Sequence, residues 1–88
     1  MTIGTTAFAR RRFDIEAQRI GFEYDSAPDC LPGLCLLLGG MARAKQPVGA
    51  LPSLLRALIR AEGMALPARA ERALANAEAA QKAAEVRR

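Results

Sequence analysis

The side chains that most often perform catalysis are scarce in this chain. It contains no histidine, which removes the commonest general base, the Ser–His and Cys–His nucleophile pairs, and most zinc sites. Its serines, Ser26 and Ser53, do not lie in the context of a hydrolase nucleophile. Acidic residues two apart, such as Asp14 and Glu16, point in different directions on a helix and make a poor acid–base pair. The sequence therefore predicts no catalytic residues and no enzyme activity.

The cysteine and glycine patterns also argue against a cofactor or metal site. Cys30 and Cys35 have neither the two-residue spacing of redox pairs nor that of a zinc ribbon. Gly39-Gly40 is not followed by Lys-Ser or Lys-Thr, so it is not a phosphate-binding loop. We expect no metal, no cofactor and no small-molecule substrate, and we expect both cysteines to act as small hydrophobic residues in the core.

The charged residues suggest an anionic partner. The chain has a formal net charge of +4 and a pI near 9.8, which fits binding to nucleic acid, binding to an acidic protein face, or solubility alone. A cluster of three arginines lies near the N-terminus, and two more, spaced i, i+4, repel unless an anion or carboxylate is near. For the N-terminal cluster we prefer a solvated helix face, partly compensated by Asp14 and Glu16, over contact with an anion. The predicted contacts to an anionic partner are Arg10, Arg11, Arg12, Arg56 and Arg60.

A DNA-binding helix-turn-helix does not fit the chain. If Gly63 is the turn glycine, positions of the second helix that should be buried fall on Arg69 and Arg72. If Gly21 is the turn glycine, Pro28 falls inside the second helix. A helical DNA-binding protein of another kind stays open as an interpretation.

The first element is predicted to be a helix. Residues 5–20 carry helix signals, with capping threonines at the start and Gly21 as a left-handed stop. Apolar residues there also alternate with period two, so a short β-hairpin over residues 13–24 is the competing interpretation. We prefer the helix because Gln18-Arg19 is a poor two-residue turn.

Further helices follow, and the fold class is an all-α compact bundle of three to four helices. One opens at Asp29, is apolar nearly all round, and is predicted to form the centre of the fold, with a bend or stop at Gly39-Gly40. The next has the clearest helical pattern and ends at Gly63. Its predicted core stripe is Leu51, Leu54, Leu55, Leu58 and Ile59.

The last helix, from Pro67 to about Glu85, is rich in Ala and short of large side chains. We therefore divide the chain into a helical core, residues 1–66, and an Ala-rich C-terminal helix of the same domain, residues 67–88, outside the minimal core. Small side chains permit close helix approach, so a protein partner or a second copy is expected to pack there; a tail packed on its own core is the alternative. The predicted partner-binding residues are Ala70, Ala73, Ala77, Ala80 and Ala84.

The sequence as a whole predicts a small non-enzymatic protein that works by protein–protein interaction. It would be an adaptor, inhibitor or regulatory subunit of the kind that bacteria, phages or mobile elements encode. The alternatives are a nucleic-acid-binding regulator that uses Arg-rich helix faces, and a structural subunit of a larger assembly. The uncharged stretch 30–42 is too short to span a membrane. With two cysteines and no signal sequence, we expect a cytoplasmic location.

Overall fold

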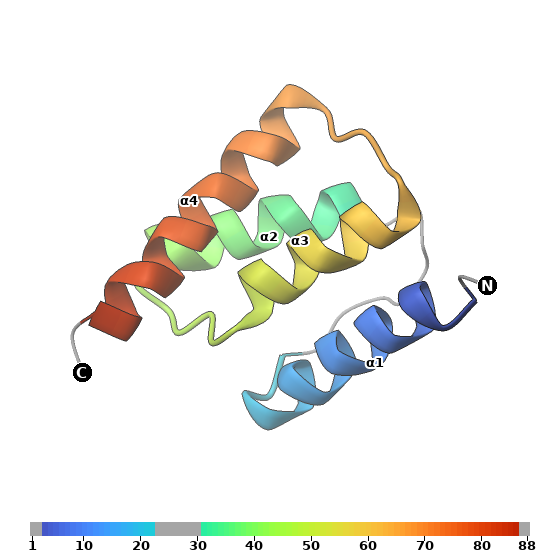
Figure 1. Ribbon diagram of the computed structural model, residues 1–88. Helices are drawn as coiled ribbons and strands as arrows, with labels where there is room; N and C mark the ends of the chain where they lie inside the picture. The colour runs from blue at the N-terminus through green and yellow to red at the C-terminus, as the bar shows by residue number, and fades with distance from the viewer. Residues whose placement is uncertain (1–2, 23–30, 87–88) are drawn as a thin grey trace.

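The computed structural model describes residues 3–22 and 31–86 of the chain. This part contains helices and no strand, which confirms the all-α fold class (Figure 1). The predicted start of the second helix, at Asp29, lies outside the described residues. The helices are α1 (Ile3–Arg19), α2 (Leu31–Arg43), α3 (Leu51–Glu62) and α4 (Ala68–Val86).

The first predicted helix is present and ends as expected. Gly21 has a φ of 73°, in the left-handed region that favours glycine, and the Phe22 N–H donates to the Ala17 oxygen at 2.8 Å. The hairpin interpretation is wrong for residues 13–19, which are helical. A helix turns Phe13 and Ala17 toward the core together, because residues four apart share a face.

α3 is the helix that contacts all the others in the described part of the chain. In Figure 1 it lies between α1 on one side and α2 with α4 on the other. Its predicted stripe is confirmed, since Leu54 is partly buried and the remaining members are fully buried. Gly63 ends the helix with a φ of 68°, and its N–H donates to the Arg60 oxygen at 3.1 Å, as expected for a glycine stop.

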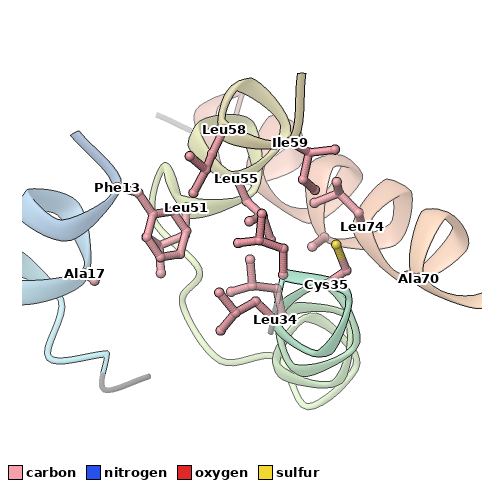
Figure 2. Packing of buried hydrophobic residues seen from close by; sticks show 13 residues of the cluster. Phe13, Ala17, Leu34, Cys35, Leu51, Leu55, Leu58, Ile59, Ala70 and Leu74 are labelled. Carbon is pink, nitrogen blue, oxygen red and sulfur yellow. The ribbon is translucent and has the colours of Figure 1, made fainter. Parts of the chain in front are cut away.

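All four helices contribute to one hydrophobic core (Figure 2). Phe13 projects from α1 toward α3, and Cys35 and Leu74 meet between α2 and α4. No polar or charged side chain is buried among the described residues. The expectation that the C-terminal helix lies outside the core is wrong for the part of α4 that carries Leu74, because that side chain is fully buried.

α2 crosses α4 at a point where both helices carry small residues. The helix does not stop at Gly39-Gly40 but continues to Arg43. A Cβ atom at Gly39 would lie only 2.8 Å from Cβ of Ala73, so the glycine is needed for the approach of the two helices. Packing against α4 therefore compensates the low helix propensity of this position.

The N-terminus of α3 is capped by side chains from two other helices. Its N-cap residue, Ala50, has no side chain that could accept a hydrogen bond. The Ala50 N–H donates instead to Oε2 of Glu16 on α1, at 2.8 Å. The Ser53 N–H donates to Oε1 of Gln81 on α4, at 3.1 Å. Two of the donors that a helix start leaves unsatisfied are thus used by tertiary contacts.

Candidate functional site

A groove between α2 and α4 carries charged side chains of a single kind, arginine. Arg43 is the last residue of α2, and Arg69 and Arg72 lie in the first two turns of α4. The volume of the groove is about 310 Å³, at the low end of the range of ligand pockets, so it admits a few side chains. We call it the arginine groove, and it is lined by Leu36, Gly39, Arg43, Arg69, Arg72, Ala73 and Asn76.

Two small residues place α2 and α4 close together beneath these arginines. Gly39 is buried and Ala73 is half-buried, and a Cβ atom at Gly39 would also lie 3.0 Å from the Ala73 carbonyl oxygen. The two helix backbones therefore approach closely at this point. Because no long side chain separates the helices there, arginines from both helices can line one groove.

Two acidic residues of α4 form salt bridges with α3 and do not line the groove. Glu71 and Glu78 both accept hydrogen bonds from the Arg56 guanidinium of α3, with shortest distances of 2.7 and 2.8 Å. These hydrogen bonds lower the pKa of Glu71 and raise that of Arg56. α4 thus presents Glu71 and Glu78 toward α3, and it presents its arginines to the groove on α2.

The three groove arginines have no such partner in the part of the chain that the structure describes. None of them forms a salt bridge there, and no acidic side chain lines the groove. Arg69 and Arg72 are three residues apart and repel each other. Arg69 also lies in the first turn of α4, where the helix dipole favours negative charge. A bound anion would reduce both unfavourable interactions, and guanidinium groups bind carboxylates and phosphates in a bidentate manner.

An apolar edge adjoins the arginines. Leu36 lines the arginine groove and is 42% exposed, and the next residue on α2, Leu37, is 46% exposed without lining it. This helix is apolar nearly all round, as the sequence indicates, but these two leucines are not buried in the core. The arginine groove combines guanidinium groups with an apolar side chain that this chain leaves uncovered.

The five arginines predicted to contact an anionic partner do not share one surface. The guanidinium of Arg56 is already paired with two carboxylates of α4, so it has less need of an anion from a partner. Arg60 is exposed on the same helix. The N-terminal cluster lies on α1, where Arg10 is half-buried and the guanidinium of Arg12 is 5.9 Å from the centre of the Phe8 ring. For that cluster and Arg60, contact with an anion stays a prediction.

The alanine residues predicted to bind a partner are divided between two surroundings. Ala70 and Ala77 are 2% and 0% exposed in the core of this chain, and Ala73 packs against Gly39. The helix that packs along these three alanines is thus α2 of the same chain. The interpretation of these three residues as a partner surface is corrected to a tail packed on its own core.

The other two of the five predicted alanines, Ala80 and Ala84, line a second cavity of about 730 Å³. It lies between the end of α1, the connection from α2 to α3, and the end of α4. Glu16 also lines it, and its carboxylate already accepts hydrogen bonds from Ala50 N–H and from Arg19. The polar groups of α1 in this cavity are therefore used within the fold.

The remaining candidates for chemistry are few. Cys35 is a free, fully buried thiol, and burial raises its pKa to about 11, so it is the small hydrophobic residue that its position predicts; Cys30 lies outside the described residues. Within residues 3–22 and 31–86, no group of His, Cys, Asp and Glu could hold a metal ion. None of the helices described there has the length and apolar character needed to cross a membrane.

Arg43, Arg69 and Arg72 were not predicted from the sequence as a site. Part of the signal was present, since two arginines three apart near a helix N-terminus occupy positions where acidic residues are favoured. The contribution of Arg43 depends on how α2 crosses α4. No local pattern in the sequence contains that information.

Comparison of the chain with protein-family models, with curated proteins and with solved structures gave no match. The arginine groove is the site that the described residues support best, because none of those residues forms a salt bridge with its arginines.

Proposed function

We propose that this protein is a non-enzymatic binding protein that recognises a partner protein through carboxylates held in the arginine groove. The observation that carries the proposal is the set of three guanidinium groups, Arg43, Arg69 and Arg72, around a groove that no acidic side chain lines among the described residues. An adaptor, an inhibitor and a regulatory subunit would all use such a surface. Arginines that form no salt bridge with the described acids gain most from carboxylates supplied by another molecule.

A protein partner suits the arginine groove better than nucleic acid does. Phosphate backbones are bound by basic side chains and backbone N–H groups, and an exposed aliphatic side chain adds nothing to those contacts. The arginine groove contains exposed Leu36 and a floor of Gly39 and Ala73. Among the described residues, no aromatic side chain lines it on which an unpaired base could stack. Nucleic acid is kept as the alternative because Arg11 and Arg12 are also exposed.

The test uses two triple variants that change the net charge equally. In the groove variant, Arg43, Arg69 and Arg72 are replaced by Gln; in the control, the exposed arginines Arg11, Arg12 and Arg60 are replaced by Gln. Fluorescence anisotropy measures binding of a labelled glutamate-rich peptide and of labelled DNA across a salt titration. Circular dichroism checks that each variant is folded.

We expect the groove variant to bind the acidic peptide at least about tenfold more weakly, and the control variant to keep its affinity within about threefold. Equal losses in both variants would show that net charge alone drives binding, and absence of peptide binding at low salt would also overturn the proposal. If the wild type instead binds DNA tightly, with a steep salt dependence that the Arg11, Arg12 and Arg60 variant reduces, the nucleic-acid alternative is correct.

A further inference from the structure

We infer that the segment recognised by the arginine groove carries an apolar side chain between its carboxylates, and that this side chain packs on Leu36. This inference rests on the proposed function and specifies the chemistry of the partner at the same site. Its starting observation is that Leu36 contributes to the groove and stays 42% exposed. A large aliphatic side chain left in solvent beside a charged groove offers apolar area that a partner can bury.

The floor of the arginine groove supports the same chemistry. Gly39 and Ala73 present only backbone and a methyl group, so an inserted side chain finds no competing polar partner at the bottom. The guanidinium groups and Asn76 lie on residues that are exposed. A segment with carboxylates at its edges and an apolar residue at its centre therefore matches the distribution of charge and apolar surface.

The size of the groove limits what enters it. A volume of about 310 Å³ suits a few side chains of one segment, near the lower limit of ligand pockets. The anchor is thus expected to be a single leucine-sized residue. Contacts of this kind, with an apolar anchor at the centre and a charged rim, are typical of protein interfaces.

The experiment compares two labelled peptides that differ at one position. In the first, a leucine stands between two pairs of glutamates; in the second, an alanine takes its place. Both are titrated against the wild type, Leu36→Ala and Leu37→Ala by fluorescence anisotropy. Leu37 is the matched control because it is 46% exposed on the same helix and does not line the groove.

We expect the leucine peptide to bind the wild type about fivefold more tightly than the alanine peptide. Leu36→Ala should remove most of this difference, whereas Leu37→Ala should preserve it. The preference for leucine should persist at high salt, because apolar contacts are not screened as charges are. This combination measures the pairwise contact directly, as in a double-mutant cycle.

The outcomes separate this inference from the proposed function. If both peptides bind equally, and binding still depends on the groove arginines, the inference is wrong and the carboxylate-binding function stands. If Leu37→Ala removes the preference as much as Leu36→Ala does, the anchor does not lie in the groove and the inference is also wrong. If neither peptide binds, the proposed function is overturned first.

Discussion

The carboxylate of Glu16 joins α1 to the start of α3, and its replacement by Gln should destabilise the protein in a pH-dependent way. The group accepts hydrogen bonds from Arg19 at 2.6 Å and from the Ala50 N–H at 2.8 Å. These contacts lower the pKa of Glu16 from 4.5 to about 2, and the hydrogen bond from Arg19 is the largest cause. A carboxyl group whose pKa is lower in the folded state stabilises the fold above its unfolded pKa. That contribution is lost as the pH falls from about 4.5 to about 2.

The size of the effect follows from the shift in pKa and from solvent exposure. Each pKa unit corresponds to about 1.4 kcal/mol, so the full shift gives an upper limit of about 3 kcal/mol. Arg19 is 64% exposed, and exposed ion pairs contribute little after screening. We therefore expect Glu16→Gln to lower the free energy of unfolding by about 1 to 2 kcal/mol at pH 7. At pH 2.5 or below the difference in stability between the wild type and Glu16→Gln should be much smaller. At that pH Glu16 is protonated in the unfolded chain, and the pH is close to the folded pKa of about 2, so most of its contribution is lost.

Urea unfolding followed by circular dichroism is the appropriate measurement, since the chain has no Trp. The control is Glu62→Gln, an exposed carboxylate of α3, which should change stability by less than about 0.5 kcal/mol. Gly49→Ala should act on the same contact, because a Cβ at that position would lie 2.5 Å from Oε2 of Glu16. The combination of Gly49→Ala with Glu16→Gln should therefore cost less than the sum. A loss for Glu16→Gln that is the same at pH 7 and pH 2.5 would refute the reasoning.

Three further predictions concern the core. Gly39→Ala should destabilise by about 1 to 3 kcal/mol, because the new methyl group would lie 2.8 Å from Ala73 Cβ. Its control Gly40→Ala, with nothing within 4 Å of the added atom, should be neutral or stabilising in urea unfolding; equal effects would contradict the close approach. Ala77→Glu should unfold most of the chain, as circular dichroism would show, since Ala77 is 0% exposed; a folded variant would show that α4 is not packed as described. In a Cys30→Ala background, the buried thiol of Cys35, with a pKa of about 11, should react with iodoacetamide only after unfolding; rapid alkylation of the folded protein would contradict its burial.

The sequence was sufficient for the helices because their signals are local. The stripe of α3 repeats at helical spacing, and Gly63 and Gly21 stop their helices through their own φ angles. The burial of α4 was not predictable from the same signals. An Ala-rich helix with only two larger apolar residues, Leu74 and Val86, has too little apolar area to indicate which helix it meets.

The contacts that fix the helices relative to one another join residues far apart in the sequence. Glu16 and Ala50 are 34 residues apart, and Arg56 and Glu78 are 22 apart. The spacing of Arg56 and Arg60 indicates that an anion or carboxylate lies nearby, and the structure contains two carboxylates beside Arg56. Nothing local in the sequence shows that these carboxylates come from α4 and not from a partner.

The same small residues explain both the wrong interpretation of the alanine seam and the origin of the arginine groove. Alanines at helical spacing do indicate close helix approach, but α2 is tethered to α4 within one chain. A tethered helix has an effective concentration in the millimolar range, so a separate partner must compete against it. Because Gly39 lets α2 approach Ala73 closely, α2 packs along the alanines of α4. This packing brings Arg43 into the groove that Arg69 and Arg72 also line. We therefore propose that the partner surface lies on the arginines beside these alanines, where binding would require α2 and α4 to stay packed.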